Sequence, residues 1–218
     1  MHPPIKMLLK IYKKLLKYFG KQDWWPAETR FEVIVGAILT QNTNWKNVEK
    51  AIINLKKAGV LSLSKLSKVL KRKICEYIRP SGFFNQKAER LILLMDFLKK
   101  NYRGSISVLM KENLKTLRRK LLGLKGVGPE TADSILLYAA DKPSFVIDAY
   151  TKRIFSRLGI SANDKYEDLQ YLFQKDLPKS VSLYKEYHAL IVELAKKHCR
   201  KKPLCSGCPL SDICNHKN

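Results

Sequence analysis

Residues 121–133 read LLGLKGVGPETAD and hold the clearest local signal in the chain. Gly126 and Gly128 flank Val127 directly after an amphipathic helical pattern, and Pro129, a favoured first residue of a helix, follows at once. Such a turn leaves backbone N–H groups unpaired at a helix N-terminus, where they point toward an approaching anion. The stretch therefore predicts two helices joined by an anion-binding hairpin. An ordinary turn between two helices is the alternative.

The charge of the chain also indicates an anionic partner. Lysine and arginine number 42 against 19 aspartate and glutamate residues, a formal net charge of +23. Nucleic acid is the first candidate and an acidic membrane surface the second. No apolar run approaches the roughly 20 residues that cross a bilayer, and lysines interrupt the N-terminal helical pattern too often for a signal peptide. We therefore expect a cytoplasmic protein, by default a monomer, that has no membrane role.

Helical periodicity runs along almost the whole chain, whereas the alternation typical of strands is nearly absent. Thr29 and Glu32 form a T-x-x-E capping box that opens the segment RFEVIVGAILTQ. This segment is apolar on most sides, as expected of a helix buried inside a bundle. Pro143 separates a helix expected at 129–140 from the segment that holds Asp148. The sequence predicts an all-α protein of about ten short helices.

Four of the five cysteines lie in one polar run, HCRKKPLCSGCPLSDIC, with the spacing C-x5-C-x2-C-x5-C. Thiolates this close together suit a metal centre better than a core. A structural zinc site usually has two C-x2-C pairs, and this run has only one. We therefore expect a [4Fe-4S] cluster with zinc as the alternative, and unliganded cysteines or disulfides as a third interpretation. The expected ligands are Cys199, Cys205, Cys208 and Cys214.

One carboxylate follows the apolar run 145–147 and opens the helical segment AYTKRIFSRLG. Taken alone, Asp148 is best interpreted as a helix N-cap, a position that aspartate often occupies. It also lies downstream of the hairpin, where a second lobe could face a DNA groove.

Together the hairpin, the carboxylate and the cysteine run resemble the endonuclease III superfamily of helix-hairpin-helix DNA glycosylases. The resemblance covers nearly the whole chain. It rests on LKGVG at 124–128 with Thr131-Ala132, on VIDAY at 146–150 with Arg153, on the cysteine run, and on AILTQNT at 37–43. The last segment looks like the family segment whose glutamine, here Gln41, inserts into the DNA stack.

This resemblance implies two helical lobes flanking a DNA-binding cleft, with a C-terminal iron–sulfur loop and double-stranded damaged DNA as the partner. We expect 25–140 to form a helical bundle with the hairpin, and 1–24 plus 141–218 to form the second lobe. Asp148 would be the catalytic carboxylate. The expected DNA contacts are Gln41, Lys125, Gly126, Val127 and Gly128.

The chain departs from the family pattern at two places. Bifunctional members carry a lysine in G-V-G-x-K-T-A that attacks the sugar, and here Glu130 stands at that position. Without the amine no imine forms by that route, so a monofunctional glycosylase is expected, with Glu130 adding electrostatic help. The first cysteine loop is also one residue shorter than the usual C-x6-C-x2-C-x5-C.

The segments around Trp24 and Trp45 are similar to the endonuclease III-like 3-methyladenine glycosylase branch. Matched residue by residue, the base-binding pocket would be Trp24, Pro26 and Trp45, although a different aromatic residue is more familiar where Trp45 stands. Alternatively, Trp24 and Trp25 are core or interface residues. The expected activity is hydrolysis of the N-glycosidic bond of a flipped-out damaged base, with an alkylated purine such as 3-methyladenine as the expected substrate. An oxidised-pyrimidine or mismatch glycosylase with lyase activity is the alternative, and a non-catalytic DNA-binding module is the third.

Overall fold

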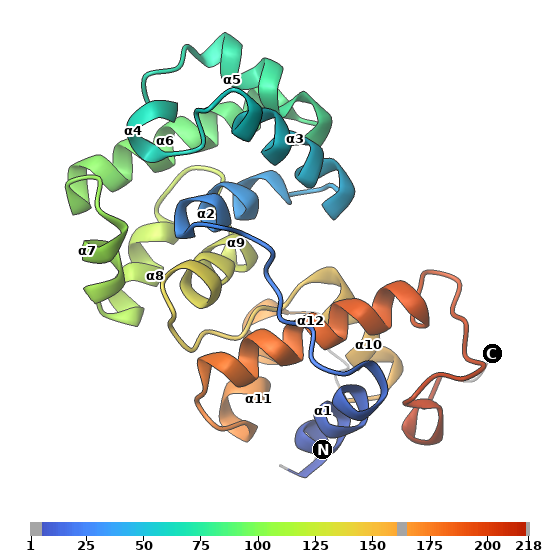
Figure 1. The fold of residues 1–218 in the computed structure, drawn as a ribbon. Helices are drawn as coiled ribbons and strands as arrows, with labels where there is room; N and C mark the ends of the chain where they lie inside the picture. Colours follow the sequence, from blue (N-terminus) through green and yellow to red (C-terminus); the bar gives the residue numbers. More distant parts are fainter. Residues whose placement is uncertain (1–5, 161–164, 217–218) are drawn as a thin grey trace. The chain divides into compact units, whose positions relative to one another are not determined.

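The structure is a computed structural model that describes residues 6–160 and 165–216. Within these residues the chain forms twelve α-helices and three short helical turns, and no strand (Figure 1). The prediction of an all-α fold is confirmed. No described helix combines the length and the apolar character needed to cross a membrane.

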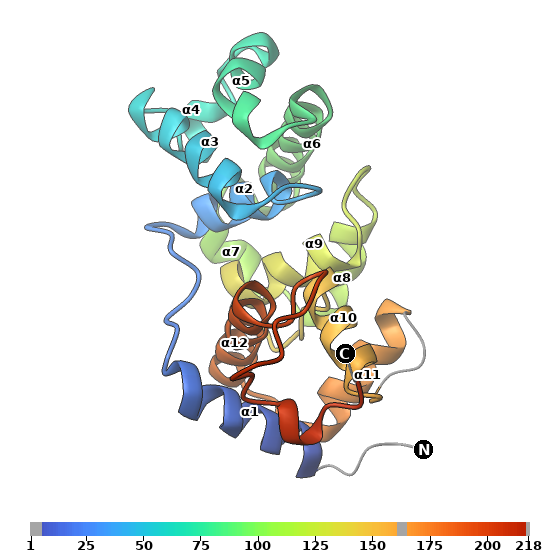
Figure 2. The ribbon, with the colours of Figure 1, turned by 90° about the vertical axis from the view of Figure 1, so that its right-hand side faces the viewer.

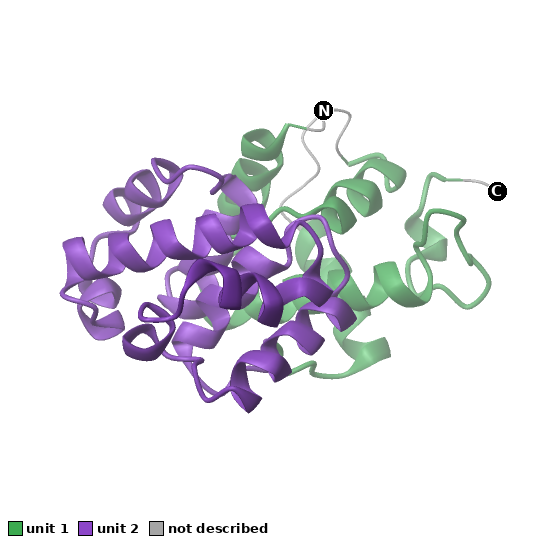
Figure 3. Ribbon diagram, turned by 90° about the horizontal axis from the view of Figure 1, so that it is seen from above, with its two compact units in different colours: residues 1–24, 143–218 green, residues 25–142 purple. Residues whose placement is uncertain are grey.

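Internal contacts divide the chain into two compact units, which Figure 3 shows in different colours. Unit 1 comprises Met1–Trp24 and Pro143–Asn218, and unit 2 comprises Trp25–Lys142. The second lobe expected from the sequence includes residues 1–5, 161–164 and 217–218, which lie outside the described residues.

Unit 2 is built around one buried helix, α2 (Arg30–Leu39), in which every residue after Arg30 is buried. The helix packs against α3, α6, α9 and η2 (Figure 1). The other elements of this unit are α3 (Trp45–Lys57), α4 (Leu63–Leu66), α5 (Lys71–Ile78), η1 (Arg79–Ser81), α6 (Phe84–Tyr102), α7 (Ile106–Lys111), α8 (Leu114–Leu122), α9 (Pro129–Ser134) and η2 (Ile135–Ala139).

The capping box predicted at the start of α2 forms only in part. The Thr29 hydroxyl accepts from the Glu32 amide at 3.1 Å, as predicted. The Glu32 carboxylate instead accepts from the Glu28 amide at 3.2 Å and pairs with Lys56 Nζ at 3.0 Å. Lys56 lies on α3, so the carboxylate connects two helices instead of completing the reciprocal cap.

The helix predicted at 129–140 is present but changes its winding. It begins as α9 and continues as η2, a π-helical turn in which the Ala140 amide donates to the Ile135 carbonyl at 3.0 Å. Residues 131–140 are all buried, so the segment after the hairpin runs into the core of unit 2.

Unit 1 has an aromatic core. Phe145 stacks on Phe173 with ring centroids 4.1 Å apart, and the Tyr187 ring lies 5.6 Å from Phe173. The Tyr187 hydroxyl donates to the Leu8 carbonyl at 2.9 Å and so connects the first and last helices of the unit. The elements are α1 (Lys6–Phe19), α10 (Ala149–Arg157), α11 (Tyr166–Asp176), α12 (Val181–Lys197) and η3 (Ser211–Ile213).

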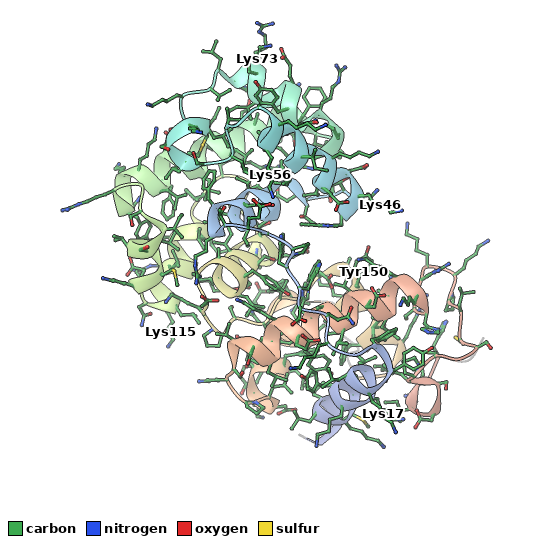
Figure 4. All side chains as sticks on the ribbon, viewed as in Figure 1. Lys17, Lys46, Lys56, Lys73, Lys115 and Tyr150 are labelled. Carbon is green, nitrogen blue, oxygen red and sulfur yellow. The ribbon has the colours of Figure 1, made fainter. Side chains whose placement is uncertain are left out.

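The excess positive charge lies on the surface of both units. Figure 4 labels Lys17 in unit 1 and Lys46, Lys73 and Lys115 in unit 2, all of them exposed. Lysines distributed in this way make each unit attractive to a polyanion.

Candidate functional site

Asp148 in unit 1 is the N-cap of α10, as its surroundings in the sequence suggested. Its Oδ1 atom accepts from the Thr151 amide at 2.7 Å and from the Thr151 hydroxyl at 2.8 Å. The other oxygen, Oδ2, lies 3.6 Å from Nε2 of His188 on α12. One oxygen therefore caps the helix, and the other faces an imidazole.

The environment of Asp148 favours its ionised form. Burial by itself would raise the pKa of this carboxyl, but His188 and the two Thr151 donors lower it more, so the pKa lies below its ordinary value. Sequence analysis did not single out His188. The available signal was a polar residue on the buried face of a helix, which needs a partner there.

Trp24 extends this arrangement within unit 1. Its ring centroid lies 5.7 Å from that of His188, with the two planes tilted by 37°. Of the three expected pocket residues, Trp24 is thus beside the imidazole that faces Asp148. Pro26 and Trp45 belong to unit 2.

Unit 2 has its own aromatic group. Trp25 contacts the Trp45 ring edge-on at 5.2 Å between centroids, and Tyr138 lies 5.1 Å from the same Trp25 ring. A Cβ at Gly36 would lie only 3.1 Å from Trp25 Cζ2, so the glycine leaves room for the indole against α2. Sequence analysis did not include Tyr138, and it left Trp25 out of the three expected pocket residues.

The hairpin lies between α8 and α9, where the sequence predicted it. Gly126 has φ +84°, a conformation that residues with a side chain rarely adopt. Val127 is buried and Lys125 is exposed. The two helices are also joined by Arg118 and Asp133, whose two parallel hydrogen bonds measure 2.9 and 3.0 Å.

Gln41 is in direct contact with the hairpin. Its Nε2 atom donates to the Gly126 carbonyl at 3.0 Å and to the Thr131 hydroxyl at 2.9 Å. Its Oε1 atom accepts from Arg90. Two elements expected to contact DNA, far apart in the sequence, are therefore adjacent within unit 2.

Glu130 is the second residue of α9 and is exposed. It directly follows Pro129, and its backbone carbonyl accepts from the Ser134 hydroxyl at 2.8 Å. The carboxylate at the position of the family lysine thus lies in the first turn after the hairpin, where the helix dipole favours negative charge.

The cysteine loop, residues 199–214, is hydrogen-bonded to α10, the helix that begins after Asp148 (Figure 2). The Arg157 guanidinium donates to the carbonyls of Arg200 and Lys201 at 2.7 and 2.9 Å and to Cys199 Sγ at 3.3 Å. Arg153 donates to the Cys199 carbonyl at 2.9 Å.

The loop contains the four thiols of Cys199, Cys205, Cys208 and Cys214. Burial raises the pKa of Cys208, and Cys199, Cys205 and Cys214 raise it further. All four are free thiols, partly buried. Among the described residues no group of three or more histidine, cysteine, aspartate and glutamate side chains is arranged to hold a single metal ion. Four cysteines within one C-terminal loop are consistent with the iron–sulfur loop of endonuclease III-type proteins.

Comparison with known proteins identifies the family. Residues 35–179 match the model of the HhH-GPD superfamily of base excision DNA repair proteins. The chain belongs to the HhH-GPD superfamily. It is a base excision repair DNA glycosylase, a hydrolase of N-glycosyl bonds.

Relatives of this HhH-GPD glycosylase span nearly its whole length. A provisionally named DNA repair glycosylase of Methanocaldococcus jannaschii is 56% identical, with 97% of each chain covered. Endonuclease III of Thermotoga maritima is 30% identical over 95% of this chain and 92% of its own.

Two solved structures are also similar. The H. pylori 3-methyladenine DNA glycosylase MagIII, bound to 1,N6-ethenoadenine, has a TM-score of 0.79 and 35% identity, covering 89% of this chain and 98% of its own. Endonuclease III in a non-covalent complex with DNA has a TM-score of 0.82 at 21% identity, covering 97% and 95%. Among these four proteins only the name of the H. pylori glycosylase specifies a base, so the substrate of this chain is a separate question.

Proposed function

We propose that this glycosylase removes alkylated purines such as 3-methyladenine and leaves an intact abasic site. The observation that carries the proposal is the carboxylate of Glu130 in the first turn of α9, where a lyase of this family has its amine. A carboxylate cannot form an imine with the sugar, so β-elimination has no nucleophile at this position.

Asp148 supplies the chemistry of base release in this proposal. Cleavage of an N-glycosidic bond passes through an oxocarbenium-like sugar, which a nearby carboxylate stabilises while it activates water. The lowered pKa of Asp148 supports this role, because the group is ionised at neutral pH. The bonds from Thr151 also hold the carboxylate in one orientation.

Tryptophan rings suit an alkylated purine. A 3-methylated purine is a cation and a good leaving group, so it needs a stacking surface more than a general acid. Indole faces favour cationic rings by about 0.5–2 kcal/mol. Trp24, Pro26 and Trp45 are the proposed base-contacting residues, and within unit 2 Trp25 supports Trp45 by its edge contact. The ethenoadenine bound by the H. pylori relative supports a purine substrate.

Gln41 and the hairpin contact the DNA in this proposal. The hairpin amides and Lys125 would bind phosphate, and Gln41 would fill the space that the flipped nucleotide leaves. Together with the basic surface, these contacts would offset the few kcal/mol that unstacking a base costs.

Another lysine could in principle replace the missing amine. Burial and the charge of Arg90 lower the pKa of Lys87 to about 8, the range of a reactive amine. However, Lys87 is 0% exposed and its Nζ atom donates to two backbone carbonyls. Lys87 is therefore unsuited to attack a sugar.

Cys199, Cys205, Cys208 and Cys214 would hold the iron–sulfur cluster. When bound, the cluster supplies structure, since hydrolysis of a glycosidic bond transfers no electrons. Arg200, Lys201 and Lys202, all exposed, would then form a basic loop next to the phosphate backbone.

The test is base release from duplex DNA that contains alkylated purines, with strand breaks measured before and after hot alkali. We expect free 3-methyladenine, and breaks only after alkali. Breaks without alkali would contradict the monofunctional assignment. Base release only from oxidised pyrimidines or mismatches would support the alternative, an oxidised-pyrimidine or mismatch glycosylase with lyase activity. Similarity to two relatives favours this alternative: endonuclease III of Thermotoga maritima and the thymine-DNA glycosylase of Aeropyrum pernix, each 30% identical to this chain.

A further inference from the structure

Lys87 connects two turns of unit 2 through a buried amine. Its Nζ atom donates to the Leu39 carbonyl at 2.8 Å and to the Ser81 carbonyl at 2.6 Å. Leu39 ends α2 just before the turn 40–44, and Ser81 ends η1 within the turn 79–83. The side chain is 0% exposed, so both hydrogen bonds are shielded from water.

The turn 79–83 ends in an unusual residue. Phe83 has φ +46°, in the left-handed region, and its side chain is 60% exposed. A conformation of this kind is unfavourable in a residue other than glycine and persists only where its surroundings impose it. The Lys87 amine holds the Ser81 carbonyl two residues before Phe83, and the backbone amide of position 87 donates to the Phe83 carbonyl at 3.0 Å.

Arg90 lies one turn after Lys87 on α6 and reaches a third turn. It donates through Nη1 to Gln41 Oε1, and its side chain lies directly against Gly126 of the hairpin. A Cβ at Gly126 would overlap Arg90 Nε, Cδ and Cγ. Since Gln41 also donates to the Gly126 carbonyl, the three residues form a closed set of contacts.

We propose that Lys87 and Arg90 are positioning residues that hold the turns 40–44 and 79–83 and the hairpin 124–128 in one arrangement before DNA arrives. This inference rests on the proposed DNA contacts of Gln41 and the hairpin. Turns that are ordered in advance lose less conformational entropy on binding, so more of the contact energy is available for distorting the duplex.

The chemistry of position 87 supports this role. A cation without water is costly, and the lowered pKa of Lys87 reflects that cost. Position 87 lies on the buried stripe of α6 with Leu91, Leu94 and Leu98, where an apolar residue would satisfy packing. The benefit of an amine there is that it reaches two carbonyls at the ends of two elements.

The experiment compares Lys87→Met, Arg90→Met and the matched control Lys99→Met, which removes the same charge from an exposed position of α6. One probe is an undamaged duplex. The other carries a tetrahydrofuran abasic-site analogue with 2-aminopurine in the opposite strand, whose fluorescence reports unstacking. Both probes are independent of the identity of the excised base.

We expect Lys87→Met and Arg90→Met to bind the undamaged duplex within about threefold of wild type, because phosphate contacts dominate that affinity. Preference for the abasic-site duplex should fall at least about tenfold, and the fluorescence increase should shrink. Arg90→Lys should restore part of the preference. Lys99→Met should behave as wild type.

Equal losses on both probes, in proportion to the folded fraction, would mean that the two residues only stabilise the fold and would overturn the proposal. Since Arg90 is only partly buried, its variants keep the test valid if Lys87→Met does not fold. Gln41→Ala and Lys125→Ala are measured in parallel. If those two variants bind both probes as wild type does, the proposed DNA contacts of Gln41 and the hairpin are wrong, independently of the results for Lys87 and Arg90.

Discussion

Nε2 of His188 lies 3.6 Å from Oδ2 of Asp148, and the two side chains are only 5% and 13% exposed. The pair joins α12 to the N-terminus of α10, forty residues away along the chain. Because it shapes the ionisation and the orientation of the proposed catalytic carboxylate, it is the starting point for testing the mechanism.

Replacing Asp148 by asparagine should abolish base release and preserve DNA binding. Asparagine is a good N-cap, so its side-chain oxygen can still accept from Thr151 and the fold should persist. The loss of a carboxylate that stabilises the transition state should reduce the single-turnover rate by at least about 100-fold. Asp96→Asn, on the exposed face of α6, is the matched control. Normal turnover by Asp148→Asn would refute the assignment.

Replacing His188 by phenylalanine should shift the acid limb of the pH–rate profile upward. Burial raises the pKa of Asp148 and His188 lowers it, so removing the imidazole leaves burial less opposed. In the wild-type protein the lowered pKa should place the acid limb below the ordinary carboxyl range of about 4. Single-turnover rates between pH 3 and pH 7 measure the shift, and coincident profiles would contradict it.

The same pKa has a consequence for stability. A carboxyl with a lowered pKa in the folded state stabilises the fold above its unfolded-state pKa, and this stabilisation disappears as the pH falls through the folded-state value. Wild type should therefore have a larger free energy of unfolding than Asp148→Asn, and this difference should be smaller at pH 3 than at pH 7. Urea unfolding at the two pH values checks the sign.

Replacing Glu130 by lysine should create a covalent intermediate that borohydride can trap. The position is exposed in the first turn of α9, so the amine is solvated there. Its unfavourable interaction with the helix dipole should lower the stability of the helix by only about 0.3–1 kcal/mol. Denaturing gels of enzyme mixed with abasic-site DNA and borohydride should show the adduct for Glu130→Lys and not for wild type. Trapping of the wild type would show that another amine acts.

Replacing Trp45 by leucine should weaken base release more than replacement by phenylalanine. Leucine removes the ring that the proposal stacks on the cationic base, a loss of about 0.5–2 kcal/mol, or roughly 2- to 30-fold in rate. Phenylalanine keeps part of that attraction. Rates measured on alkylated DNA at saturating enzyme separate the three proteins, and equal rates would remove Trp45 from the pocket.

Protein purified without oxygen should contain iron and a brown chromophore. Cys205→Ser should lower the iron content and the melting temperature together, because a bound cluster connects four points of the loop. Arg157→Ala should also lower the melting temperature, since it removes hydrogen bonds to three residues of that loop. Wild-type protein that contains zinc and no iron would refute the cluster.

Features that are local in the chain could be predicted from the amino-acid sequence alone. Helical periodicity, the two glycines of the hairpin and the close spacing of the cysteines each reflect neighbouring residues, so no distant partner is needed to interpret them. The N-cap position of Asp148 belongs here too, because Thr151 is only three residues away.

Contacts between side chains from distant segments could be identified only in the folded chain. Periodicity shows which face of a helix is buried but not what lies against it, so it could not pair His188 with Asp148 or Trp25 with Trp45. Lys87 shows the limit most clearly. Its place on the apolar stripe of α6 is visible in the sequence, but its amine is explained only by two carbonyls that the fold brings within hydrogen-bonding distance.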